Sequence, residues 1–310
     1  MINRESYKGE KMNILEEINE LKKEKKAIIL VHNYQRPEIQ DIADFLGDSL
    51  GLAKQAAETK ARIIVFCGVR FMAETAKILS PGKMVLLPRK EAGCPMADMI
   101  TAEDLRRLKK NHPDAKVVSY VNTNADVKAE SDVCCTSANA VKVVKNISAK
   151  RIIFTPDKNL AAYCQRFVNK EIIPWNGYCY VHEKIREEEV CLAKEKLPDA
   201  LLLIHPECNP SVIDLADEVL STSGMVSFAK KSGKKRFLIG TEEGLIYRLQ
   251  KENPGKEFYT AGTAKMCRNM KLTTLNDVYL SLKEERYPIE LAGEIIKSAQ
   301  KALTAMLKYV

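Results

Sequence analysis

AIILVHNY at 27–34, KVVSYVN at 116–122 and LLLIHPE at 201–207 are three apolar runs that each end in polar residues. A second set, RIIVFCG at 62–68, RIIFTPD at 151–157 and RFLIGTE at 236–242, repeats with nearly the same spacing, and so does a third, MVLLP at 84–88, EIIPW at 171–175 and EFYTA at 257–261. All these runs are short, rich in β-branched or other apolar residues, and bounded by polar residues, glycine or proline, which is typical of buried strands. The chain therefore contains three copies of one unit of about 87 residues.

Helical patterns lie between the strands of each unit. The expected helices span 41–59 and 72–79, then 138–146 and 160–168, then 223–231 and 245–251. Alternation of strands and helices predicts parallel sheets with crossover helices. We therefore predict an α/β fold of three similar three-layer α/β/α sandwich domains. They span 1–112 (with an N-terminal helix), 113–196 and 197–287, and a C-terminal helix over 288–310 packs back on the body.

The composition indicates a water-soluble protein with sizeable cores. Of 310 residues, 45% are hydrophobic and 29% charged, and no apolar stretch approaches the roughly 20 residues of a membrane span. The first residues form a charged helical pattern and not a signal peptide. We expect a cytoplasmic protein without a membrane partner. The net charge of +8 comes from lysines spread along the helices, so we expect no nucleic-acid partner and a field that helps to collect anionic metabolites.

Polar residues stand where the first strand of each unit ends. They are His32, Asn33 and Tyr34, then Tyr120 and Asn122, then His205 and Glu207. Ligands of parallel α/β sheets bind at the carboxyl ends of the strands, so these side chains mark the expected site, although each alone is equally compatible with a structural role. The next helices begin near Ser49, Ser137 and Thr222, the last one residue out of strict register. Such residues cap helices, and helix N-termini also bind phosphate and carboxylate groups.

Three of the nine cysteines, Cys94, Cys179 and Cys267, fall at the same place in the three units, 85 and 88 residues apart. Metal binding or redox chemistry is the favoured reading of so many cysteines, because secreted disulfide scaffolds are usually much shorter. Three thiolates suit a [4Fe–4S] cluster with one open iron that acts as a Lewis acid. A zinc site completed by His182 is the competing interpretation. The other six cysteines fit a structural role.

Several ordered motifs resemble the quinolinate synthase family. They are VHNYQ at 31–35, GDS at 47–49, GC at 93–94 with MADM at 96–99, SYVNT at 119–123, VKAESD at 127–132, CTS at 135–137, WNG at 175–177, HPEC at 205–208, STSGM at 221–225, GTE at 240–242 and NMK at 269–271. The resemblance runs from about residue 27 to 285. It implies three α/β sandwich domains around a pseudo-threefold axis. It also implies an enzyme of de novo NAD synthesis, a transferase that condenses iminoaspartate with dihydroxyacetone phosphate to quinolinate, phosphate and water.

The resemblance carries over to individual residues. It implies that Cys94, Cys179 and Cys267 bind one [4Fe–4S] cluster, and that iminoaspartate is bound by His32, Ser49, Tyr120, Asn122, Ser137, His205, Glu207 and Thr222. His182 would support the cluster or touch substrate. For the acid–base steps we expect Glu207 to act as a general base and Tyr34 and Tyr120 to handle the triose oxygens, with His205 beside them. An aspartate-oxidising enzyme is a possible transient partner. The alternatives are a zinc or iron–sulfur hydro-lyase on another small acid, and a non-enzymatic iron–sulfur sensor.

Overall fold

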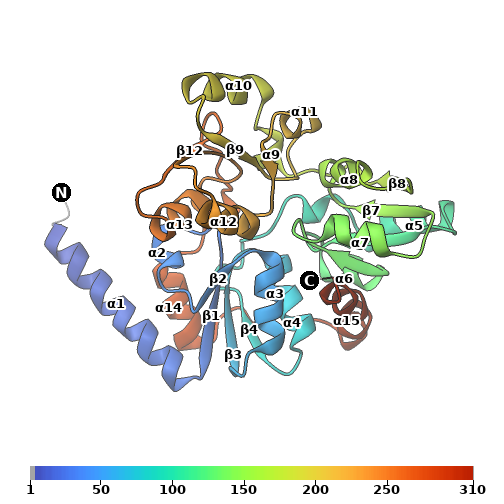
Figure 1. Cartoon of the computed structure of the whole chain (residues 1–310). Helices are drawn as coiled ribbons and strands as arrows, with labels where there is room; N and C mark the ends of the chain where they lie inside the picture. Colours follow the sequence, from blue (N-terminus) through green and yellow to red (C-terminus); the bar gives the residue numbers. More distant parts are fainter. Residues whose placement is uncertain (1–3, 310) are drawn as a thin grey trace.

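The computed structural model describes residues 4–309 and contains three four-stranded sheets in which every strand pair is parallel. The first sheet, with order β2-β1-β3-β4, consists of β1 Ala27–His32, β2 Phe45–Gly47, β3 Ile63–Cys67 and β4 Met84–Leu86. The second, β6-β5-β7-β8, consists of β5 Lys116–Tyr120, β6 Val133–Cys135, β7 Arg151–Thr155 and β8 Glu171–Pro174. The third, β10-β9-β11-β12, consists of β9 Leu201–Ile204, β10 Glu218–Val219, β11 Arg236–Gly240 and β12 Glu257–Thr260. The predicted α/β class with three similar units is confirmed, and Figure 1 shows the units as three lobes.

The helices repeat as well. Each first strand is followed by a short helix, α2 Pro37–Gln40, α6 Ala125–Ala129 or α11 Pro210–Ile213. The crossover helices are α3 Ser49–Glu58, α7 Ala140–Asn146 and α12 Thr222–Lys231, then α4 Arg70–Leu79, α8 Lys158–Gln165 and α13 Gly244–Glu252. Each of the three repeat-matched cysteines, Cys94, Cys179 and Cys267, is followed by one short turn of helix: η1 Ala97–Met99, α9 Tyr180–Glu183 or η2 Asn269–Lys271.

The predicted helix over 41–59 is wrong in its first half. Residues 45–47 form β2 instead, and each unit has such an edge strand, so the units have four strands and not three. One aspartate before each of these strands accepts a hydrogen bond from a backbone N–H of the neighbouring first strand. The pairs are Asp44 with Ile29, Asp132 with Val117 and Asp217 with Leu202, at 2.8, 2.8 and 2.7 Å. In each unit this carboxylate therefore fixes the register of the edge strand against the first strand.

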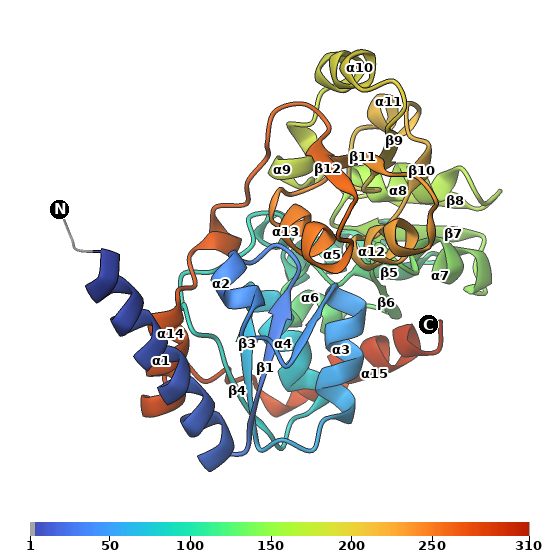
Figure 2. The ribbon, with the colours of Figure 1, turned by 60° about the vertical axis from the view of Figure 1, so that its left-hand side comes forward.

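The helix that follows each cysteine loop packs on the next sheet along the chain. Leu105 of α5 Ala102–Asn111 packs with Val117 and Ile153 of the second sheet, and Val190 of α10 Glu187–Lys196 packs with Leu202 of the third. The last of the three, α14 Leu275–Glu284, returns to the first sheet. There it lies beside α1 Arg4–Glu24, as Figures 1 and 2 both show. This cyclic exchange closes the three units on one another and places each cysteine loop between two of them.

The C-terminal helix α15 Gly293–Leu307 packs against α4, α6 and β6, and so joins the first unit to the second (Figure 2). Its buried face, Ala299, Ala302, Leu303 and Met306, belongs to the same hydrophobic cluster as both of these units. The C-terminal helix thus contacts both the first and the second unit. Within residues 4–309 every helix is too short or too polar to cross a membrane.

Candidate functional site

One cavity of about 730 Å³, its open mouth included, lies where the three units meet. Of the residues that the sequence singles out, Asn33 does not line it, and its amide donates to Thr222 at 2.8 Å instead. The other thirteen do: His32, Tyr34, Ser49, Cys94, Tyr120, Asn122, Ser137, Cys179, His182, His205, Glu207, Thr222 and Cys267. They come together because parallel strands end at the same edge of each sheet, and the three edges face one point.

The first strands each present two side chains to the cavity, at matching positions two residues apart. The pairs are His32 with Tyr34, Tyr120 with Asn122, and His205 with Glu207. In the first and third pairs the imidazole Nδ1 accepts the backbone N–H two residues later, at 3.2 Å for Tyr34 and 3.4 Å for Glu207. The proton of each neutral ring is therefore on Nε2, where it is free to be donated to a ligand.

Both imidazoles are held neutral by their surroundings. Burial is the main cause that lowers the pKa of His32 to about 3, and the Lys271 ammonium adds to it. Burial likewise lowers the pKa of His205 to about 3, with His182 as the second cause. A neutral imidazole can donate a hydrogen bond to a carboxylate without forming an ion pair with it.

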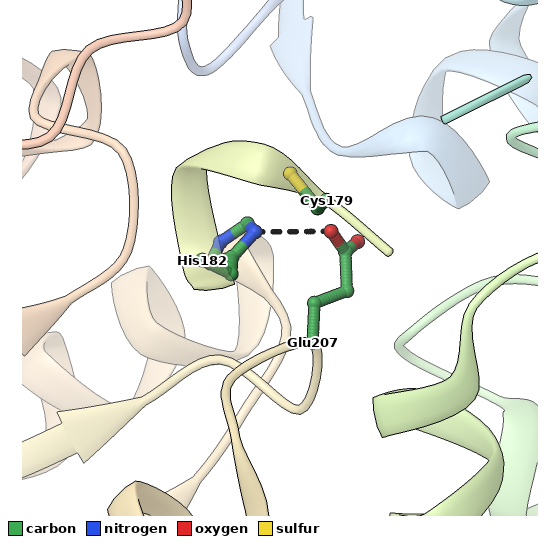
Figure 3. Close-up of side chains that lie close together, drawn as sticks. All are labelled: Cys179, His182 and Glu207. Atoms are coloured by element: carbon green, nitrogen blue, oxygen red, sulfur yellow. Dashed lines mark ion pairs between the residues drawn. The ribbon is translucent and has the colours of Figure 1, made fainter. Parts of the chain in front are cut away.

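Glu207 is the centre of the polar groups in the cavity. Its Oε1 accepts a hydrogen bond of 2.5 Å from the Tyr120 hydroxyl, and its Oε2 lies 3.0 Å from Nδ1 of His182 (Figure 3). Burial alone would raise the pKa of Glu207, but the imidazoles of His182 and His205 and these close contacts outweigh it and lower the pKa to about 2. The carboxylate is therefore ionised at neutral pH and is available as a base.

The two tyrosines stay protonated. Burial, followed by the negative charge of Glu207, raises the pKa of both Tyr34 and Tyr120 well above the usual value. Tyr34 has a different partner from Tyr120, because its hydroxyl lies 2.5 Å from Oγ1 of Thr241. The cavity thus holds one carboxylate base between neutral donors.

Three hydroxyl side chains stand at equivalent places in the three units. Ser49 and Thr222 are the first residues of α3 and α12, directly after the capping residues Asp48 and Ser221, so Thr222 is in strict register and the expected offset of one residue is wrong. Ser137 departs from the prediction in another way. Because α7 begins only at Ala140, Ser137 lies in the turn before that helix.

A wider hollow of about 1230 Å³ opens beside the cavity and shares Asp48 and Ser137 with it. Its walls come from α3, α7 and α12, one helix of each unit. Lys54 and Lys145 line this hollow, and among the side chains of residues 13–309 neither has an acidic partner in an ion pair. This hollow gives the cavity a positively charged approach.

The three repeat-matched cysteines are half-buried and lie close enough to influence one another electrostatically, Cys94 with Cys267 and Cys179 with Cys94. Burial is the main cause that raises the pKa of each thiol, to about 12 for Cys94. Thiolates at these positions therefore need a cationic partner, and three loops that converge with one thiol each fit an iron–sulfur group.

The thiols and carboxylates also allow a different metal site. Ligand atoms of Cys179, His182 and Glu207 lie within 4.8 Å of one another, as Figure 3 shows for a helix of the second unit and a strand end of the third. A single zinc ion with Zn–S bonds of about 2.3 Å needs its ligand atoms as close together as this. Among the described residues the sulfurs of the three repeat-matched cysteines do not form so compact a group. The competing three-cysteine zinc site is thus not among the compact ligand groups of the described residues.

Comparison with known proteins agrees with this geometry. The quinolinate synthetase A protein family matches residues 16–308. The chain belongs to the quinolinate synthase family. It is 55% identical to a quinolinate synthase from Geobacter sp. (strain M21) over 94% of this chain and 96% of the relative. It is 54% identical to one from Thermodesulfovibrio yellowstonii over 96% and 98%, and 50% identical to one from Alkaliphilus metalliredigens over the same shares. The resemblance found in the motifs is confirmed, and the chain is an enzyme that acts on small molecules.

The quinolinate synthase site also contains residues that sequence reasoning did not select. Glu242 lines the cavity and accepts the backbone N–H of Cys267 at 2.9 Å, and the buried Asp157 carboxyl faces the backbone N–H of Cys179. Both residues end the second apolar run of their unit, and that shared position was the signal available in the sequence. Glu242 thus holds the loop of Cys267, whereas Asp157, whose Oδ1 accepts the Leu160 N–H at 2.7 Å, lies beside the loop of Cys179.

Proposed function

We propose that the protein condenses iminoaspartate with dihydroxyacetone phosphate to quinolinate, with release of phosphate and water, and so supplies NAD synthesis. The observation that carries this proposal is the ionised Glu207 between Tyr120 and His182, in a cavity that three half-buried cysteines also line. Family membership supports the same reaction. The aspartate-oxidising partner and the cytoplasmic location stay predictions.

The substrates are a dicarboxylate and a phosphate ester, and the cavity offers neutral donors for both. His32 of the first unit and His205 of the third each offer an Nε2–H group. Ser49 and Thr222 add hydroxyls at helix N-termini, where the helix dipole favours anions. We expect both anions to enter through the hollow lined by Lys54.

The acid–base steps follow from the contacts around Glu207. Ring formation from these substrates needs protons to be removed from carbon and returned to oxygen. A buried carboxylate within hydrogen-bond reach of a tyrosine serves as the base that removes them. Tyr120, which donates to Glu207, and Tyr34, which bonds to Thr241, both line the cavity and are placed to contact the oxygens of the triose.

Cys94, Cys179 and Cys267 would hold a [4Fe–4S] cluster through three irons. When bound, the cluster supplies a Lewis-acidic iron for the loss of water. The chain positions the loop of Cys267 through Glu242 and the Tyr180 hydroxyl, which contacts the thiol of Cys267, and Asp157 lies beside the loop of Cys179.

The compact group of Cys179, His182 and Glu207 favours a second candidate, a metal-dependent hydro-lyase with one ion at that position. The two candidates differ in what happens to Glu207. As a ligand it would be tied to the ion, whereas as a base it must stay free. Anaerobically purified protein with iron and acid-labile sulfide supports the quinolinate synthase reaction, and colourless protein with one zinc per chain contradicts it.

The test is an anaerobic assay of quinolinate formation from dihydroxyacetone phosphate and freshly generated iminoaspartate. We expect the wild-type protein to form quinolinate and Glu207→Gln to keep its iron and sulfide while activity falls about 100-fold or more. Glu183→Gln is the matched control, because Glu183 lies one residue after His182 but outside the cavity. Near-normal turnover of Glu207→Gln would remove this residue from the mechanism.

A further inference from the structure

Thr241 connects two groups of the cavity without lining the cavity itself. It follows β11, and its side chain is buried, with 2% of its surface exposed. Its Oγ1 lies 2.5 Å from the hydroxyl of Tyr34 and 2.8 Å from Nε2 of His182. One hydroxyl of the third unit therefore joins a tyrosine of the first to a histidine of the second.

The fold itself does not require a hydroxyl at this position. Strand register makes Thr241 equivalent to Gly68 and Pro156 in the other two units, since Val65, Ile153 and Leu238 pair with matching residues of the first strands. Neither glycine nor proline has a side chain that forms a hydrogen bond. The hydroxyl is thus particular to the unit that carries Glu207.

The neighbours of Thr241 decide the direction of its hydrogen bonds. Nδ1 of His182 lies 3.0 Å from the negative charge of Glu207 without forming an aligned hydrogen bond, so the charge favours the tautomer with the proton on Nδ1 and leaves Nε2 as an acceptor. Thr241 has a single hydroxyl proton, which it then donates to Nε2. Its oxygen must accept from Tyr34. The phenolic proton of Tyr34 therefore points to Thr241, and the phenolic oxygen offers its lone pairs to the cavity.

We propose that Thr241 is a positioning residue, which keeps Tyr34 as a hydrogen-bond acceptor toward the substrate and His182 in the tautomer that faces Glu207. The role rests on the proposed function, because Tyr34 and Glu207 are there the groups that act on the substrate. The ligand group that an accepting Tyr34 oxygen recognises is a donor, such as the hydroxyl of a triose or the N–H of an imine.

Thr241→Val tests this role, because valine has nearly the same shape and no hydroxyl. Misplacement of reacting groups by a small distance costs up to about 100-fold, so we expect kcat to fall about 10- to 100-fold. KM for the dicarboxylate should change less than about threefold, since Thr241 does not contact the cavity. Thr241→Ser restores the hydroxyl and should return kcat to within about threefold of wild type.

A merely structural threonine would behave differently. If its role is only to fill space, Thr241→Val should be as active as wild type and Thr241→Ser no better. A second comparison uses Tyr34→Phe. If Thr241 acts through Tyr34 and His182, Thr241→Val should add little to the loss already caused by Tyr34→Phe, as expected for residues in one hydrogen-bond network. Full additivity of the two losses would overturn the proposal.

The tautomer can be measured apart from the reaction. The chain has four histidines, so ¹⁵N-histidine NMR of the purified protein, with His182→Gln used for assignment, can report which ring nitrogen of His182 carries the proton. We expect an unprotonated Nε2 in wild type and a changed Nε2 resonance in Thr241→Val. A protonated Nε2 in wild type would overturn the inference even if the protein forms quinolinate. An unprotonated Nε2 in protein that forms none would leave the tautomer correct and the proposed function wrong.

Discussion

Replacing Glu242 by glutamine should loosen the loop of Cys267. The Glu242 side chain is fully buried, and its two oxygens have separate tasks. Oε1 accepts the backbone N–H of Cys267 at 2.9 Å, and Oε2 accepts that of Gly244 at 2.7 Å. The ammonium group of Lys271 lies 2.9 Å from Oε1 and 3.0 Å from Oε2.

The size of the effect follows from these contacts. Glutamine has one carbonyl oxygen, so one of the two backbone N–H groups would face an amide NH₂ and lose its acceptor, at a cost of about 1–3 kcal/mol. Removing one charge of a buried ion pair costs about 3–5 kcal/mol. Lys271 keeps some exposure and the Tyr34 carbonyl as an acceptor, so the lower part of that range applies. We expect a total of about 4–6 kcal/mol, or roughly 6–9 °C in melting temperature for a chain of this length.

The assay is thermal unfolding followed by circular dichroism under anaerobic conditions, together with the rate of iron loss to a chelator. Glu252→Gln is the matched control. Glu252 pairs with Arg248 at 2.6 Å within one helix and is more exposed, and such pairs contribute about 0.3–0.5 kcal/mol. A Glu242→Gln protein that melts within about 2 °C of wild type and loses iron equally slowly would refute the reasoning.

Three further results are expected. Cys179→Ser should abolish iron binding and activity, whereas Cys134→Ser, at a fully buried position outside the cavity, should keep both, as iron analysis would show. The folded protein holds the pKa of His32 at about 3 and the unfolded chain near 6.5, so only the unfolded state takes up this proton between those values. Stability should therefore fall as pH falls through that window. His32→Gln should reduce the slope by up to about 1.4 kcal/mol per pH unit in urea unfolding. Finally, Lys54→Gln should lower kcat/KM for the phosphate ester at low salt and weaken its salt dependence, with kcat unchanged.

The sequence predicts the units well because the strong strands are long and apolar. β1, β3, β5, β7, β9 and β11 each have four to six residues, most of them buried. The edge strands β2, β6 and β10 have only two or three residues, too few for a periodic pattern. What fixes them is a long-range contact, the aspartate that accepts a strand N–H fifteen positions earlier, and a local pattern does not reveal such a contact.

The site residues could be selected because the repeat marks equivalent positions and parallel strands align their ends. The partners of those residues could not. Thr241 contacts Tyr34 across more than two hundred positions of the chain, and Asn33 donates to Thr222 over a similar separation at 2.8 Å. Such pairs depend on how the units face one another. That arrangement is set by α5, α10 and α14, and the sequence does not say that these helices cross to the neighbouring sheet.

The repeat determines which positions of each unit face the cavity, and the different residues at those positions in the three units determine its chemistry. At one strand position the three units present Tyr34, Asn122 and Glu207, which are a phenol, an amide and a base. At a second, register aligns Asp157 and Glu242, which lie beside cysteine loops, with Val69, an apolar wall of the cavity. The loop of Cys94 therefore lacks the carboxylate that the other two cysteine loops have. The amide of Asn269 in the third unit donates instead to the Gly93 carbonyl of this loop at 2.8 Å, and Arg70 N–H donates to the Ala92 carbonyl at 2.8 Å. Three units of the same fold thus line one cavity, and at these two strand positions each unit contributes a different side chain.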